Sequence, residues 1–148
     1  MTVLFRPAAR DEVPAVVALL ADDILGQARE TTDPAPYLSA FDAMQRQGEN
    51  HLIVGLSGDR LVACYQLIFI PGLSAKATLR AQIEGVRVAS DLRGRGIGAL
   101  LVADAEARAR AAGCGQMQLT TNRTRMDAHR FYDRLGFTPS HIGYKKTL

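Results

Sequence analysis

Long apolar runs are missing from this sequence of 148 residues: no stretch approaches the about 18 consecutive apolar residues that a membrane-spanning helix needs. The first residues also lack the basic, apolar and small-residue order of a secretory signal. We therefore expect a soluble, cytoplasmic protein with no membrane partner.

Cysteine is scarce as well, since only Cys64 and Cys114 are present and no CxxC pair occurs. Neither has a histidine at a metal-binding spacing, so the sequence predicts two reduced, buried thiols and no metal site. Cys114 lies between two glycines, which keeps a nucleophilic role for its thiol as an alternative.

Runs of five or more basic residues are absent, and the aromatic residues are not interleaved with basic ones. Residues 1–74 carry 5 basic and 9 acidic side chains, whereas residues 75–148 carry 13 and 6, for a formal net charge of +3. A surplus this diffuse argues against a nucleic-acid partner.

The length and composition of the chain, with 47% hydrophobic and 22% charged residues, predict one globular domain over residues 1–148. Alternating and helical apolar patterns follow one another along the chain. Strands are expected at Val3–Arg6, His51–Leu56, Leu61–Ile70, Thr78–Val88, Gln116–Thr121 and Phe137–Leu148, and helices at Asp11–Asp22, Tyr37–Gln47, from the glycine run to Gly113, and at Asp127–Leu135. The predicted fold is α/β: a mixed, mostly antiparallel sheet flanked by helices, with one parallel connection through the central helix.

The chain is organised around Gln82–Ala112, where a strand leads through the glycine-rich run 93–98 into an alanine-rich helix. Unpaired backbone N–H groups and the positive end of the helix dipole meet at such a turn, which favours an anion. Alternating glycines let the backbone approach a pyrophosphate, and Arg93 and Arg95 add charge. The alternative is an ordinary strand-to-helix turn with surface arginines.

The spacing of the run narrows the choice of ligand. No lysine follows the glycines, as the Walker A pattern of ATP-binding P-loops requires. The third glycine also comes one residue too early for G-x-G-x-x-G, the pattern of NAD-binding proteins. The run instead fits Arg-x-x-Gly-x-Gly, with Arg93, Gly96 and Gly98, five residues after a Val-x-Val strand end. This pattern resembles the coenzyme A signature of the GNAT superfamily of acyl-CoA-dependent N-acyltransferases.

A second segment, residues 128–137, resembles the A-x-x-F-Y-x-x-x-G-F motif near the C-terminus of many GNAT members. With the order of elements, the resemblance covers essentially the whole chain. It implies acetyl-CoA as co-substrate, with strand backbone pairing to the pantetheine arm and loop amides holding the pyrophosphate. The coenzyme-binding residues it implies are Val86, Val88, Arg93, Gly94, Arg95, Gly96, Ile97 and Gly98.

One position departs from the family pattern. Many members carry an asparagine three residues before the alanine of the second motif, often contacting the pantetheine arm, but Arg125 stands there and Asn122 lies three residues earlier. Asn122 is expected to take that role only if the loop between bulges.

Transfer to an amine needs a neutral nitrogen, and a lysine-like amine with a pKa of ~10.4 costs roughly 4.6 kcal/mol to deprotonate at pH 7. Glu84 is the candidate base, because strand alternation would place it on the face of Val86 and Val88. The alternative is a structural ion pair between Glu84 and a neighbouring arginine, Arg80 or Arg87.

Two further side chains enter the chemistry. His129 is a substitute base or a residue that faces solvent. The GNAT resemblance places Tyr132 beside the sulfur of the coenzyme. There it is expected to protonate the departing thiolate, since a phenol with a pKa of ~10 stays protonated at pH 7. A tyrosine kept for packing is the alternative.

The sequence therefore predicts an acyl-CoA-dependent N-acyltransferase that moves acetyl from acetyl-CoA to a primary amine of a small molecule or a protein, by direct attack in a ternary complex. The competing classes are a catalytically silent acyl-CoA-binding module and a basic nucleic-acid-binding domain. Nothing in the sequence decides between a monomer and a homodimer.

Overall fold

A computed structural model describes residues 1–148, apart from the side chain of Ile24. The chain forms two compact units, Met1–Gln118 and Leu119–Leu148. Within the described residues, no helix is both long and apolar enough to cross a lipid bilayer.

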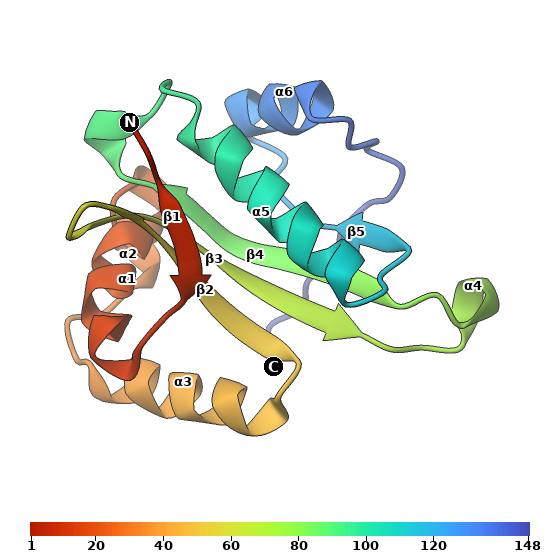
Figure 1. The fold of residues 1–148 in the computed structure, drawn as a ribbon, viewed down its shortest axis with the longest axis horizontal. Coiled ribbons are helices and arrows are strands. Elements are labelled where there is room, and N and C mark those ends of the chain that lie inside the picture. Colours follow the sequence, from red (N-terminus) through yellow and green to blue (C-terminus); the bar gives the residue numbers. More distant parts are fainter. The chain divides into compact units, whose positions relative to one another are not determined.

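The first unit is built on a five-stranded sheet in the order β1-β2-β3-β4-β5 (Figure 1). The strands are β1 (Leu4–Pro7), β2 (Asn50–Ser57), β3 (Arg60–Ile70), β4 (Arg80–Val88) and β5 (Gln116–Gln118). The first three pairings are antiparallel and the β4–β5 pairing is parallel. The predicted sheet, mostly antiparallel with one parallel connection, is confirmed.

Helices cover both faces of this sheet. They are α1 (Val13–Leu20), α2 (Ile24–Arg29), α3 (Ala35–Gln47) and α5 (Ile97–Ala111), with short 3-10 turns η1 (Arg10–Glu12) and η2 (Ser90–Leu92). The α5 helix packs against β3 and β4, α1 contacts the same two strands, and α3 packs against β2 (Figure 1). The side chain of Tyr65 in β3 points toward α5, and its hydroxyl donates a hydrogen bond to the Asp104 carboxylate. The side chain of its neighbour Cys64 points to the opposite face of the sheet.

The core lies between these layers. Its largest fully buried side chains are Tyr65, Ile53, Leu67, Ile83, Leu101, Val54, Val62, Val102 and Cys64. Most of them come from β2, β3 and β4. The strand and helix on either side of the β4–α5 connection are therefore packed into the core.

The α2 helix was not predicted from the sequence, which reads as a link after Gly26. A glycine usually marks a helix end, but here it lies inside the helix. Asp23 is the N-cap, and its side chain accepts a hydrogen bond from the Gly26 N–H.

The connection between β3 and β4 contains a single turn, α4 (Ser74–Ala77), whose backbone is left-handed. Ala75, Lys76 and Ala77 have φ angles of 51°, 58° and 58°, in the left-handed region. Non-glycine residues there cost about 1–2 kcal/mol each. The turn is therefore a local store of backbone strain.

Replacing Lys76 by glycine should relieve part of this strain. Glycine also has a larger conformational entropy in the unfolded state, which offsets part of this relief. We expect a net gain in stability of about 0.5–1 kcal/mol, or about 1–4 °C in melting temperature. Lys76→Ala removes the same charge but keeps Cβ, and should leave the melting temperature within about 1 °C. Equal shifts for both variants in thermal unfolding would mean that the charge, and not the backbone, is responsible.

The second unit contains one helix, α6 (Met126–Arg134). The ring of Tyr132 meets those of Phe131 and Phe137 edge-on, with centroids 5.0 and 5.6 Å apart. Residues 137–148 form neither helix nor strand, so the strand predicted there is wrong. Pro139 and Gly143 interrupt the segment, and the described part of this unit has no other strand to pair with it.

Candidate active site

A bulge in β4 shapes the candidate site. Gly85 and Val86 both lie opposite Tyr65 of β3, so β4 holds one extra residue there. Gly85 has a φ of 56°, which residues with a Cβ rarely adopt, and this explains why glycine stands at the bulge. The flanking pairs are Gln66 with Glu84 and Cys64 with Arg87.

The extra residue shifts the alternation of β4. Glu84 and Arg87 now share one face of the sheet, and Val88 lies on the other. The expectation that Glu84 shares a face with Val88 is therefore wrong, because it assumed an unbroken strand.

The β4–β5 ladder is short, with only three residue pairs, and it ends at Gln82 and Gln118. From Ile83 to Val88, no strand among the described residues pairs with this edge of β4. The half-buried stretch that includes Val86 and Val88 therefore presents backbone groups to a ligand, and an extended amide-bearing chain can pair with such an edge.

This edge leads through η2 into the glycine loop. Gly94 and Gly96 have φ angles of 77° and 81°, and a Cβ built on either would meet no atom within 4 Å. Gly96 is the N-cap of α5, and no side chain forms a capping hydrogen bond there. The backbone N–H groups of the first turn, including those of Ile97 and Gly98, are therefore available to an anion. The Ile97 side chain is buried, which anchors the start of the helix.

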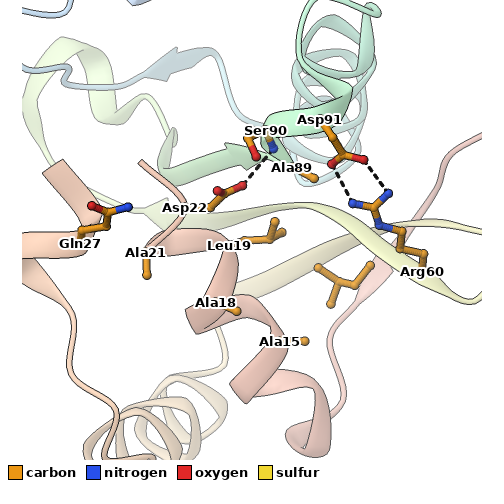
Figure 2. Close-up of a pocket in the computed structure, with 11 residues that line it drawn as sticks. Ala15, Ala18, Leu19, Ala21, Asp22, Gln27, Arg60, Ala89, Ser90 and Asp91 are labelled. Atoms are coloured by element: carbon orange, nitrogen blue, oxygen red, sulfur yellow. Dashed lines mark hydrogen bonds and ion pairs between the residues drawn. The ribbon is translucent and has the colours of Figure 1, made fainter. Parts of the chain in front are cut away.

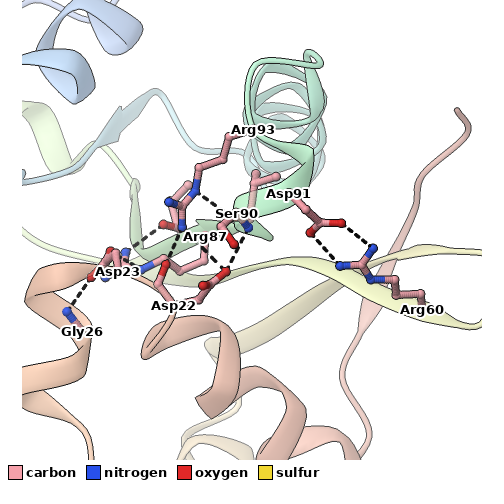
Figure 3. A network of polar contacts seen from close by, with 10 residues as sticks. Asp22, Asp23, Gly26, Arg60, Arg87, Ser90, Asp91 and Arg93 are labelled. Atoms are coloured by element: carbon pink, nitrogen blue, oxygen red, sulfur yellow. Dashed lines mark hydrogen bonds and ion pairs between the residues drawn. The ribbon is translucent and has the colours of Figure 1, made fainter.

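Arg93 holds the loop against α1 (Figure 3). Its guanidinium donates to the backbone oxygens of Asp22 at 2.6 Å and Val88 at 3.2 Å. The Asp22 carboxylate in turn accepts from the Ser90 N–H at 2.9 Å, and this bond holds the Asp22 pKa below its usual range. Arg95 is exposed at the same loop.

Arg87 anchors the bulge to α2 (Figure 3). Its Nε lies 3.1 Å from Oδ2 of Asp23, and the two side chains are only 13% and 17% exposed. Asp23 is also the N-cap of α2, so a single carboxylate connects that helix to β4.

Glu84 is exposed and does not take part in this pair. Its Oε1 accepts a hydrogen bond from Nε2 of Gln82 at 2.7 Å. Among the ion pairs of the described residues, none includes Glu84, and Arg80 instead donates to Gln118. The structural ion pair considered as the alternative for Glu84 is therefore wrong.

A cleft of about 490 Å³ lies between α1, the start of β3 and η2, and the hydrogen-bonded pair Asp22 and Ser90 lines part of it (Figure 2). Its charged groups already have partners. Arg60 and Asp91 form two hydrogen bonds of 2.9 and 2.7 Å, and Asp22 binds the Ser90 N–H. Alanine side chains of α1 supply much of the remaining wall. We therefore place the candidate site at β4 and the glycine loop and not at this cleft.

In the second unit, the hydrogen bonds of Asn122 stay within its own loop. Its side-chain oxygen accepts from the N–H and the hydroxyl of Thr124, at 3.0 and 2.7 Å. Its backbone oxygen accepts from the N–H of Arg125 at 3.0 Å, and a His129 ring nitrogen lies 3.0 Å from it. His129 is half-buried and braces the loop, which differs from a solvent-facing side chain.

Comparison with known proteins decides the family. Residues 16–137 match the profile of the acetyltransferase (GNAT) family. The chain belongs to the GNAT acetyltransferase family. Its fold and its resemblance to GNAT members, both expected from the sequence, are thereby confirmed, and GNAT enzymes take their acetyl group from acetyl-CoA.

Three related proteins illustrate the range of GNAT relatives. A solved structure described as a transcriptional regulator from Bacillus halodurans has a TM-score of 0.95 and 42% identity, covering 99% of this chain and 100% of that one. An aminoalkylphosphonate N-acetyltransferase of Salmonella typhimurium is 45% identical over 67 residues, which are 45% of this chain and only 44% of that enzyme. An uncharacterized N-acetyltransferase of Bacillus subtilis is 29% identical over 128 residues, covering 84% and 87% of the two chains. The GNAT family profile, together with two relatives named as N-acetyltransferases, supports N-acetyl transfer as the reaction class.

The cysteines of this GNAT protein do not resemble activated nucleophiles. Burial raises the pKa of the Cys64 thiol to about 12. Burial also raises the pKa of Cys114, and the charge of Glu49 adds to the effect. Both shifts disfavour the thiolate that a nucleophilic cysteine needs.

Sequence reasoning gave no site role to Asp22, Asp23 and Gln118. Asp22 and Asp23 lie in the turn between α1 and α2, far from β4 in sequence, so only the fold brings them to Arg93 and Arg87. The aspartate before α2 was the available signal, as an N-cap residue.

Proposed function

We propose that this GNAT protein transfers acetyl from acetyl-CoA to a primary amine, by direct attack of the amine on the thioester in a ternary complex. The observation that carries the proposal is the unpaired edge of β4, which runs from Ile83 to Val88 and leads into the open glycine loop at the start of α5. An extended chain with amides and a pyrophosphate at one end, as in coenzyme A, matches both features.

In this scheme the backbone of Val86 and Val88 pairs with the pantetheine amides, and the amides of residues 94–98 bind the pyrophosphate. Arg93 positions the loop, and Arg95 adds charge toward the phosphates. The amine nitrogen bonds to the thioester carbonyl carbon, the carbon–sulfur bond breaks, and the thiolate leaves. Glu84 takes the proton of the amine, and Tyr132 gives a proton to the sulfur. The role of Tyr132, like a contact of Asn122 with the pantetheine arm, rests on the family resemblance.

The acceptor is proposed to be a small molecule with a primary amine. The relative named as an aminoalkylphosphonate N-acetyltransferase suggests the first amines to try. A panel of aminoalkylphosphonates, polyamines and lysine-containing peptides, followed by release of free thiol, separates small-molecule from protein acceptors. A protein that binds acetyl-CoA but releases no thiol with any member would be the silent binding module.

Acetyl-CoA should stabilise the folded protein. At about 100 times its Kd, we expect ~2.7 kcal/mol, which is several degrees in melting temperature. A duplex oligonucleotide at the same concentration should have little effect. A shift with the oligonucleotide and none with acetyl-CoA would reverse the proposal in favour of a nucleic-acid-binding domain.

Glu84→Gln should slow transfer to amines of high pKa more than to amines of low pKa, because only the former depend strongly on a base at neutral pH. Raising the pH should restore part of the rate. Glu106→Gln, the same change on α5, is the control and should leave both rates near the parent values. A loss that is independent of pH and of amine would mean that Glu84 does not act as the base.

A further inference from the structure

A chain of polar side chains leads across the β4–β5 pair to Glu84. Arg80 Nη1 donates to Gln118 Oε1 at 3.3 Å, and Gln118 Nε2 donates to Gln82 Oε1 at 2.9 Å. Gln82 Nε2 then donates to Glu84 Oε1 at 2.7 Å. Gln118 is the cross-strand partner of Gln82 in the last residue pair before β4 loses its neighbour. The chain therefore ends on the candidate base, where the open edge begins.

The direction of this chain is fixed by its two ends. A guanidinium can only donate hydrogen bonds, and an ionised carboxylate can only accept them. Each glutamine between them must therefore turn its oxygen toward Arg80 and its NH₂ group toward Glu84. Flipping either amide breaks at least one bond, so one orientation is favoured.

We infer that Gln82 and Gln118 are positioning residues that orient the Glu84 carboxylate toward the acceptor amine. The bond from Gln82 occupies one carboxylate oxygen and leaves the other to accept from the amine. This inference rests on the proposed function, because it needs Glu84 to be the base.

A nearby glutamine supplies a matched control. Gln66 lies directly across from Glu84 on β3 and is half-buried, like Gln82 and Gln118. Its Nε2 donates to Asn50 Oδ1 at 2.7 Å and not to Glu84. Gln66→Met therefore changes a similar side chain beside Glu84 without touching the chain that ends on it.

Gln82→Met keeps the length of the side chain and removes its hydrogen bond to Glu84. We expect kcat/KM for a high-pKa amine of the panel to fall about tenfold at pH 7, with the loss shrinking as the pH rises. Acetyl-CoA affinity should stay within about twofold. Gln66→Met should keep the parent pH profile.

Adding Glu84→Gln to Gln82→Met tests whether Gln82 acts through Glu84. If it does, the double variant should be no slower than Glu84→Gln alone, within about twofold. Additive losses in the double variant would overturn the inference, since they would show that Gln82 acts independently of the base.

Gln118→Glu tests the direction of the chain. A glutamate at 118 still accepts from Arg80, but it cannot donate to Gln82, so Gln82 must turn its NH₂ group toward residue 118 and its oxygen toward Glu84. We expect an unchanged or higher melting temperature together with the pH profile of Gln82→Met. A purely structural chain predicts instead that activity follows the melting temperature.

Different results would contradict the proposed function and the positioning role of the two glutamines. No thiol release by the parent protein with any amine of the panel would contradict the proposed function. Parent turnover with unchanged pH profiles in both Gln82→Met and Gln118→Glu would contradict only the positioning role. If Gln82→Met lowers the melting temperature strongly, Gln118→Glu alone decides.

Discussion

Gly96→Val should leave the protein folded and abolish most of its acetyl-CoA binding. The space in front of Gly96 is open in the protein, with no atom within 4 Å of an added Cβ, so the side chain would occupy only the space proposed for the pyrophosphate. Losing two hydrogen bonds to a charged group, at about 1.5–3 kcal/mol each, corresponds to a loss of about 10²–10⁴-fold in affinity. Isothermal titration with acetyl-CoA measures it.

The backbone strain of this variant needs its own control. Gly48 ends α3 with a φ of 77°, close to the 81° of Gly96, and a Cβ there also meets no atom within 4 Å. Gly48→Val therefore carries a similar conformational cost, about 1–2 kcal/mol, away from the glycine loop. Equal acetyl-CoA affinity in the two variants would show that the loop is an ordinary strand-to-helix turn.

Tyr132→Phe should lower kcat about 10²-fold and leave acetyl-CoA affinity nearly unchanged, if the phenol protonates the departing thiolate. The substitution keeps the ring, which packs edge-on against Phe131 and Phe137, and removes only the hydroxyl. The unfolding midpoint, measured on the same variant, separates a loss of stability from a loss of chemistry. Single-turnover measurements ensure that the chemical step is the one observed.

Tyr144→Phe is the matched control, since it makes the same change on a tyrosine that is 90% exposed in the tail of the same unit. It should keep the parent kcat. If Tyr132→Phe also keeps it while chemistry is rate-limiting, water and not Tyr132 is the proton source.

The sequence predicted the first five strands and their order along the chain, because the apolar patterns of the β2–β3 hairpin, β4 and α5 are strong and local. It failed at Gly85, where alternation was assumed to continue through the strand. A glycine inside a strand is a known sign of a bulge, so the signal was present. Its consequence, which face Glu84 takes, follows only from the pairing with β3.

The glycine loop was predicted from its motif, but the roles of its two arginines were not separated. Both were expected beside the anion. The structure ties Arg93 to Asp22 and Val88 and leaves Arg95 exposed. This difference depends on where the turn after α1 meets η2, a contact between segments about 70 residues apart that no local pattern encodes.

The two oxygens of Asp23 give the first unit an internal coupling. One oxygen caps α2, and the other pairs with Arg87 beside the bulge. Fraying of α2 therefore weakens the anchor of β4, and a shift of β4 removes support from α2, so the two segments should open as one cooperative unit in hydrogen exchange. A ligand that orders either segment then favours order in the other, by the same free energy in both directions.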